Sequence, residues 1–259
     1  MLALLRQCPE SPPDSSWCGR GASRKERLTL TRALLAALLA MGLINIAGAV
    51  VISVPGTSNP WLAGMPAGAT ASILDVAPAQ SPAQVTGLAF APGDALRFSA
   101  VGSTDHCSPG SCGLAGAEGD LGEGSYAHAA GPENGIGNVT ALIDSLIGVF
   151  LDGNVPSGVA PSGLDFSTAL SRDFATLSPL LKQPFYIGDG FRNDGVTVQS
   201  FLVPAGATRL FLGTMDGYDW WNNVGSLTVT VALVPEPGSV ALLGLAFAAL
   251  GFSRRRKLH

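Results

Sequence analysis

The stretch Leu210-Phe211-Leu212-Gly213-Thr214-Met215-Asp216-Gly217-Tyr218-Asp219-Trp220-Trp221-Asn222-Asn223-Val224-Gly225-Ser226-Leu227-Thr228-Val229-Thr230-Val231 decides the fold. Residues 210–213 are apolar and residues 226–231 alternate with period two, so the stretch predicts two half-buried strands joined by a loop. The chain also holds 33 Gly and 18 Pro among 47% hydrophobic residues. This composition favours many short strands between turns over long helices.

The loop between these strands is rich in oxygen-bearing side chains, although only 13% of the chain is charged. Four of them fall within eight residues: Asp216, Asp219, Asn222 and Asn223. Carboxylate and amide oxygens are the ligands that calcium prefers. Aromatic residues interleaved with them have flat faces that suit a sugar ring: Tyr218, Trp220 and Trp221. The alternative, slightly favoured by the local residues alone, is a polar turn whose Asn and Asp side chains cap their own backbone.

Upstream segments predict further strands. We expect residues 83–90 and 95–101 to form a hairpin around a Pro-Gly turn. Residues 141–152 suit a buried strand or a helix, and their β-branched and aromatic end favours a strand. Residues 184–190 and 199–208 predict two more strands, and residues 102–137 a long loop. Strands at this spacing predict an all-β, antiparallel β-sandwich.

The N-terminal region resembles a secretory signal. A basic approach from Arg24 precedes an apolar run over residues 33–46 and the small residues Ala47-Gly48-Ala49 at a plausible cleavage point. We therefore assign residues 1–49 to the signal, with residues 1–23 as an over-called start; an uncut membrane anchor is the alternative. Export favours a disulfide between Cys107 and Cys112.

The C-terminal region reads Val234-Pro235-Glu236-Pro237-Gly238, then an apolar segment over residues 239–252, then Arg254, Arg255 and Arg256. We expect a short transmembrane helix over 239–252, which rises only about 21 Å against a hydrocarbon core of about 30 Å and needs its arginines to snorkel. The basic cluster places the C-terminus in the cytoplasm.

This order of Pro-Glu-Pro, apolar segment and arginines in residues 234–257 resembles the PEP-CTERM sorting signal. The resemblance implies recognition by a membrane-embedded exosortase of a Gram-negative bacterium. It also implies export through the inner membrane, transient anchoring, and final placement at the cell surface or in the exopolysaccharide matrix.

Residues 84–231 resemble the calcium-dependent galactose-binding lectins of bacteria, which are small jelly-roll sandwiches. The resemblance rests on Val85-Thr86-Gly87-Leu88 and on Asp216 followed by Asn222-Asn223-Val224-Gly225-Ser226. It implies calcium ligation by Asp216, Asn222 and Asn223, with carbonyls from near Asp219 or Trp220 and from near His106, and with sugar hydroxyls completing the shell. The spacing from Asp216 to Asn222 is one residue shorter than in those lectins, so calcium is better supported than galactose.

Residues 50–233 are thus predicted to form an exported module that binds a galactose-type or other glycan through a loop calcium ion. The alternative is a structural surface or matrix protein of the same fold without sugar binding. We expect no enzymatic activity, because the acidic pair Asp189 and Asp194 lies in an ordinary turn among Gly and Asn. A net charge of −4 and a pI near 5.3 argue against nucleic acid as a partner.

Overall fold

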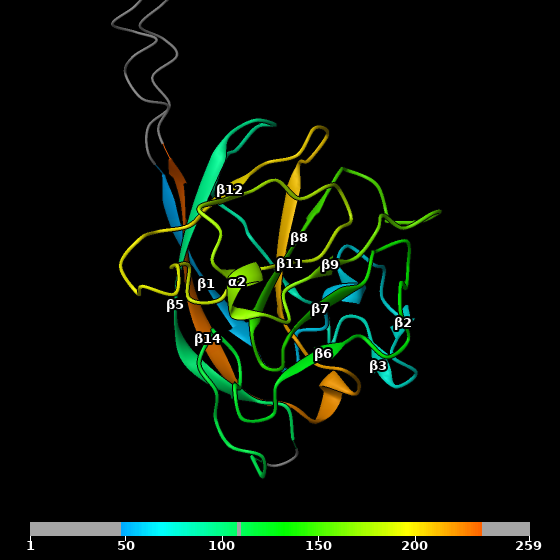
Figure 1. Ribbon diagram of the computed structural model, residues 1–259. Helices are drawn as coiled ribbons and strands as arrows, with labels where there is room; N and C mark the ends of the chain where they lie inside the picture. The colour runs from blue at the N-terminus through cyan, green and yellow to red at the C-terminus, as the bar shows by residue number, and fades with distance from the viewer. Residues whose placement is uncertain (1–47, 108–109, 235–259) are drawn as a thin grey trace, which may run out of the picture. The chain divides into compact units, whose positions relative to one another are not determined.

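The computed structural model describes residues 48–107 and 110–234, which form a nearly all-β body (Figure 1). The first sheet has the order β1 (Ala49–Pro55), β14 (Val224–Val234), β5 (Ala95–Asp105), β12 (Ser200–Leu202) and β10 (Thr176–Leu177). The second sheet has the order β11 (Phe185–Tyr186), β8 (Leu146–Leu151), β13 (Arg209–Thr214) and β4 (Ala83–Gln84).

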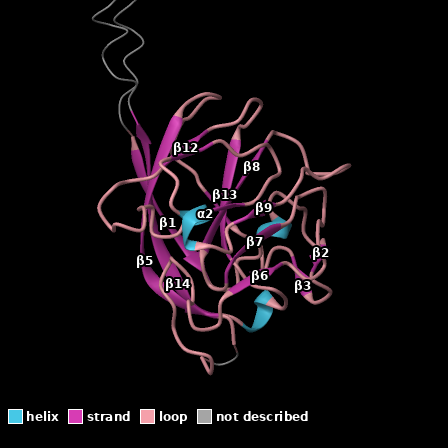
Figure 2. Ribbon diagram, viewed as in Figure 1, coloured by secondary structure: helices cyan, strands magenta, loops and turns pink. Residues whose placement is uncertain are grey.

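Smaller elements surround the two sheets. β2 (Thr70–Ala71) pairs with β3 (Asp75–Val76), and β7 (Val139–Leu142) lies between β6 (Ser125–Ala127) and β9 (Leu164–Asp165). Helical structure in the described residues is confined to α2 (Ala169–Arg172) and the 3-10 turns η1 (Pro60–Leu62) and η2 (Trp220–Asn222), as Figure 2 shows.

Strand pairing is mostly antiparallel, with short parallel pairs between β10 and β12 and between β7 and β9. β5 and β14 pair along all 11 residues of each strand. Alternate residues of β14 are fully buried, namely Leu227, Val229 and Val231. The alternation in the sequence therefore reflects one face turned to the core.

The core lies between the two main sheets. The ring of Phe201 in the first sheet lies 5.6 Å, between centroids, from that of Phe185 in the second. Phe98 packs edge-on against Phe201 at 5.0 Å, and Phe150 stacks on Phe185 at 5.3 Å. These contacts join the sheets into a sandwich-like body, which confirms the all-β prediction.

One predicted pairing is wrong. β4 covers only two residues and pairs with β13, so residues 83–90 form no hairpin with β5. β13 and β14 lie in different sheets, so the loop between them crosses the edge of the sandwich. In addition, β5 extends to Asp105 and β6 forms within the predicted long loop. Alternation identifies the buried face of a strand but not its partner.

The first sheet has two ends that matter below. At the end we call the chain-end pole, Ala49 pairs with Ala232, and Val234 pairs with Ala95. At the opposite end, which we call the loop pole, Val224 pairs with Asp105. Figure 1 shows these ends at the top and bottom of the body, with η2 in orange beside the loop pole.

Most of the predicted signal region and the predicted transmembrane helix over residues 239–252 lie outside the described residues. Ala49, assigned to the signal by its sequence, is the first residue of β1. Across residues 48–107 and 110–234, no helix is long and apolar enough to cross a membrane.

Candidate functional site

The loop Met215–Asn223, here called the oxygen loop, leaves β13 and enters β14. Four of its side-chain oxygens are inaccessible to solvent and have no hydrogen-bond partner within the described chain: Asp216 Oδ2, Asp219 Oδ1, Asn222 Oδ1 and Asn223 Oδ1. Asp216 is only 4% exposed and Asn223 only 5%. Buried polar atoms nearly always have a partner. Four unpartnered acceptor oxygens in one loop therefore suit a positively charged or hydrogen-donating partner.

The amide of Asn223 has a fixed orientation. Its Nδ2 donates to the carbonyl oxygen of Gly56 at 3.2 Å, and Thr214 Oγ1 donates to the same oxygen at 2.7 Å. Since a carbonyl oxygen only accepts, the nitrogen of Asn223 must face Gly56 and its Oδ1 must face away. Gly56 is needed here because a Cβ would lie 2.5 Å from the carbonyl oxygen of Val224.

Asp75, from the β2–β3 pair, holds the oxygen loop from outside. Its buried carboxylate accepts from the backbone N–H of Trp220 at 3.2 Å, from that of Trp221 at 2.9 Å and from Asn59 Nδ2 at 2.9 Å. Asp75 thus caps the N-terminus of η2 from a distant strand. Asp219, which occupies the cap position with a left-handed φ of 65°, makes no capping bond with its side chain.

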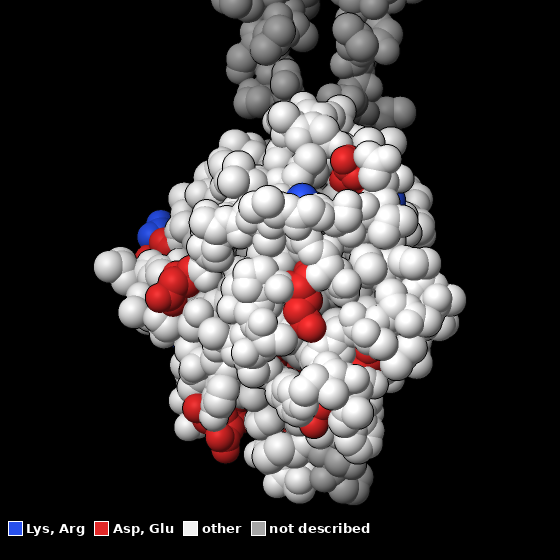
Figure 3. All heavy atoms as spheres, turned by 90° about the vertical axis from the view of Figure 1, so that its right-hand side faces the viewer, with Lys and Arg blue, Asp and Glu red and all other residues white. Residues whose placement is uncertain are grey.

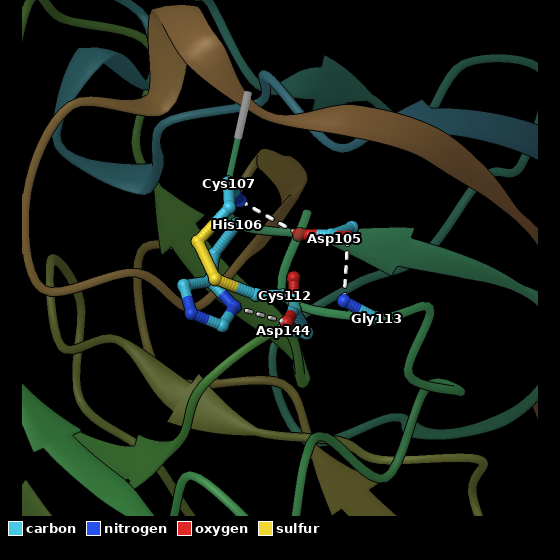
Figure 4. Close-up of a disulfide and its surroundings, with 6 residues drawn as sticks. All are labelled: Asp105, His106, Cys107, Cys112, Gly113 and Asp144. Atoms are coloured by element: carbon cyan, nitrogen blue, oxygen red, sulfur yellow. Dashed lines mark hydrogen bonds and ion pairs between the residues drawn. A yellow bond between two sulfur atoms is a disulfide. The ribbon is translucent and has the colours of Figure 1, made fainter. Parts of the chain in front are cut away.

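A second buried carboxylate, Asp144, lies in the turn between β7 and β8. Its N–H donates to Met215 O at 2.7 Å, and Met215 N–H donates to Ser145 O at 2.8 Å, which ties the turn to the oxygen loop. Asp144 Oδ2 lies 2.7 Å from His106 Nδ1, whereas its Oδ1 is buried without a partner (Figure 4).

His106 follows β5 directly, and β5 pairs with β14 at the loop pole. The structure therefore brings His106 to the side of the oxygen loop, as the metal prediction requires. Its Nδ1 is engaged by Asp144, which leaves Nε2 and the backbone carbonyl, the group that the lectin resemblance implies, as the atoms that it could offer to an ion. Next to it Cys107 and Cys112 form a disulfide, and Asp105 accepts from the N–H of Cys107 at 2.7 Å and of Gly113 at 2.8 Å (Figure 4).

The disulfide excludes one metal site. His106, Cys107 and Cys112 present a nitrogen and two sulfurs within 4.8 Å of one another. Metal binding by cysteine requires the thiolate, and both sulfurs are instead bonded to each other.

Burial dominates the electrostatics of the site. It raises the pKa of Asp216 to about 6, although the N–H of Tyr218, the nearby side-chain amide of Asn223 and the charge on His106 act in the opposite direction. Burial likewise raises the pKa of Asp144 and of Asp75. Burial opposes the charge on His106, but the bond to Asp144 and the nearby carboxylates outweigh it and raise its pKa. The site therefore favours bound positive charge.

The three aromatic residues predicted to contact a sugar differ in their exposure to solvent. Trp220 is fully buried, its Nε1 donates to Thr214 O at 2.9 Å, and its ring lies 5.5 Å from that of Trp61. The predicted sugar contact at Trp220 is therefore wrong, because η2 turns this ring into the core. Trp221 is 50% exposed and Tyr218 is 40% exposed.

A third exposed aromatic residue, Tyr126 on β6, was not predicted. It is 41% exposed, and a Cβ placed on Gly217 of the oxygen loop would lie 3.6 Å from its ring. In the part of the chain that the structure describes, Tyr126, Tyr218 and Trp221 are the exposed aromatic side chains. All three lie on or against the oxygen loop.

Comparison with known proteins bears on the C-terminus. Residues 233–257 match the family described as the PEP-CTERM protein-sorting motif. The chain carries a PEP-CTERM sorting motif. The motif implies exosortase processing, export and transient membrane anchoring before display at the cell surface. The predicted sorting residues fall in the matched range but outside the described residues: Pro235, Glu236, Pro237, Arg254, Arg255 and Arg256.

No curated protein matches this chain. No family match supports a lectin assignment for residues 50–233.

Proposed function

We propose that the exported body binds calcium in the oxygen loop and uses the ion to hold a carbohydrate at the cell surface. The observation that carries the proposal is the group of four buried side-chain oxygens without donors. An unsatisfied buried acceptor costs about 1–3 kcal/mol, and a whole domain is stable by only about 5–15 kcal/mol. Four such atoms in one loop are therefore costly unless a bound group compensates them, and a cation can compensate all four at once.

The chemistry of these donors suits calcium. Two carboxylates and two amides supply hard oxygen ligands with a formal charge of −2, and calcium takes about 6–8 oxygens in flexible geometry. Backbone carbonyls, including that of His106, and ligand hydroxyls are available to complete the shell. Zinc is disfavoured because the oxygen loop holds neither histidine nor cysteine. A bound calcium ion would supply exchangeable positions for sugar hydroxyls.

The surroundings of the oxygen loop support a neutral, ring-shaped ligand. Tyr126, Tyr218 and Trp221 offer exposed aromatic faces beside the ion site. The described residues carry fifteen Asp and Glu against five Lys and Arg, and one face of the body, drawn in Figure 3, shows scattered carboxylates and few basic groups, so the charge of the body disfavours an anionic ligand. Together with the jelly-roll resemblance, these features favour a galactose-type or other neutral glycan, held by binding without catalysis.

Calcium titration of the exported protein, followed by thermal unfolding, tests the ion. We expect Tm to rise with calcium and to fall again with chelator, and Asp194→Asn to behave as wild type. Retention on an agarose-type galactose matrix, or on a panel of immobilised glycans, tests the ligand. A Tm rise without retention on any of them would leave a structural calcium protein, and no Tm rise would contradict the ion site.

A further inference from the structure

β14 connects the oxygen loop to the sorting motif without a linker. The first residue of β14, Val224, follows Asn223 directly. The motif begins at Leu233, the second-to-last residue of β14. Leu233 is only 7% exposed and pairs with Leu96, so the motif starts inside the folded sheet. Only residues 235–238 separate β14 from the apolar segment 239–252, and four extended residues span at most about 14 Å.

The N-terminal end of the body emerges at the same place. Leu233 N–H donates to the carbonyl oxygen of Gly48 at 2.9 Å. The predicted signal cleavage point at residues 47–49 therefore abuts the start of β1, at the chain-end pole. The oxygen loop lies at the other end of β14, whose 11 residues rise by about 3.3 Å each and so span up to about 33 Å.

The distribution of charge separates the body from its ends. Residues 48–107 and 110–234 hold fifteen Asp and Glu but only five Lys and Arg, and the other ten basic residues lie in the terminal regions. An anionic lipid surface repels an acidic body. Pro235 and Pro237 also restrict the backbone of the short connection. Both effects disfavour a body that lies on its side on the membrane.

We propose that, while the chain is anchored, the chain-end pole faces the membrane and the oxygen loop points away from it by about the length of β14. The partner of the chain-end pole is then the lipid surface. The oxygen loop is open to its surroundings before the tail is processed, so capture of a ligand does not depend on release. This orientation needs no bound ion, and it stands or falls separately from the proposed function.

Energy transfer from the body to the membrane tests the orientation. The exported protein with its C-terminal tail, residues 50–259 after the predicted cleavage and therefore without Cys8 and Cys18, is reconstituted in vesicles of phosphatidylethanolamine and phosphatidylglycerol whose headgroups carry an acceptor dye. A donor dye is attached at Trp221→Cys or Tyr218→Cys in the oxygen loop, or at Ala91→Cys in the exposed turn before β5. The disulfide-bonded cysteines do not react with the dye.

We expect strong transfer from Ala91→Cys and transfer several-fold weaker from both oxygen-loop labels. Insertion of a long Gly-Ser linker between Val234 and Pro235 should reduce this difference, because the body can then tumble. Equal transfer from the two poles without the linker, or stronger transfer from the oxygen loop, would overturn the proposal.

Discussion

Two acidic turns of this protein look alike in sequence and differ in structure. In the turn over residues 192–197, Asp194 accepts from the N–H of Val196 and of Thr197 and from Thr197 Oγ1, at 2.7–2.9 Å. These bonds lower its pKa to about 2. In the oxygen loop, Asp216 Oδ1 accepts from Tyr218 N–H at 3.1 Å, but its Oδ2 has no donor, and burial raises its pKa to about 6.

The difference shows that acidity alone does not define a binding site. The turn over residues 192–197 satisfies its carboxylate with its own donors and has nothing left for a ligand. The oxygen loop leaves acceptors buried and unmatched, which is the property that an ion can use. The predictions below rest on substitutions that should act in one turn and not in the other.

The largest effect is expected from Asp216→Asn, which removes one of the two formal charges of the oxygen loop. We expect calcium affinity to fall at least about 100-fold, equivalent to about 2.7 kcal/mol, as measured by isothermal titration calorimetry. Asp194→Asn is the matched control and should leave calcium affinity unchanged. Equal losses in the two variants would mean that the ion is bound elsewhere or nonspecifically.

Without calcium, the same substitution should stabilise the protein at neutral pH. The pKa of Asp216 is raised in the folded state, so the folded protein binds more protons than the unfolded chain between pH 4 and 6, and its stability falls as pH rises through that range. A pKa raised from 3.8 to about 6 corresponds to a loss of about 3 kcal/mol above pH 6.

Urea unfolding in chelator at several pH values measures this loss. Asp216→Asn should flatten the pH profile relative to wild type and exceed it in stability at pH 7. Asp194→Asn should change the free energy of unfolding in the opposite direction. The pKa of Asp194 is lowered in the folded state, so its carboxylate contributes stability above the pKa of the unfolded chain, and this stability is lost as pH falls towards 2. If Asp216→Asn instead destabilised the calcium-free protein at neutral pH, the claim that the Asp216 carboxylate lacks a compensating partner would be contradicted.

A smaller effect is expected from Asp75→Asn. This variant weakens the hydrogen bonds that Asp75 accepts from the N–H groups of Trp220 and Trp221. The oxygens of the loop that are proposed to bind calcium are then held less rigidly. We expect calcium affinity to fall about tenfold, equivalent to about 1.4 kcal/mol. Asp173→Asn provides the control, since Asp173 accepts from Arg192 and Asn193 beside the other turn. Calcium affinity that responds equally to both variants would argue against a role for Asp75 in the site.

The smallest effects should come from the exposed aromatic residues. Trp221→Ala and Tyr126→Ala should weaken retention on the glycan matrix by several-fold, about 1 kcal/mol, and leave calcium affinity unchanged. Trp221→Phe should restore most of the retention. Trp220→Ala should instead destabilise the fold by about 3–5 kcal/mol, because its ring is buried. Aromatic variants that alter calcium affinity as well would show that their role is structural.

The sequence predicts this protein unevenly, for physical reasons. Alternating residues predicted β14 because one face of that strand is buried, whereas the pairing of β4 with β13 depends on contacts distant in the sequence. The signal pattern concealed the start of β1. Sorting residues were recognisable because their order is local.

In the candidate site, too, the features that are local in the sequence were predictable and those that depend on distant contacts were not. The grouping of oxygens in the oxygen loop was predictable because Asp216, Asp219, Asn222 and Asn223 are close neighbours in the sequence. Asp75, Asp144 and Tyr126 were not, because strand pairing brings them to the oxygen loop from 70 or more residues upstream. Adjacent tryptophans at 220 and 221 have opposite exposure because η2 turns between them, which composition cannot reveal.

The most direct measurement is anomalous diffraction from crystals of the exported protein grown in calcium. We expect a single ion peak within about 2.3–2.6 Å of Asp216 Oδ2 and Asn223 Oδ1, with Asp219 and Asn222 also in the shell. Well-ordered density at saturating calcium in which these oxygens contact only water or protein donors would contradict the ion site.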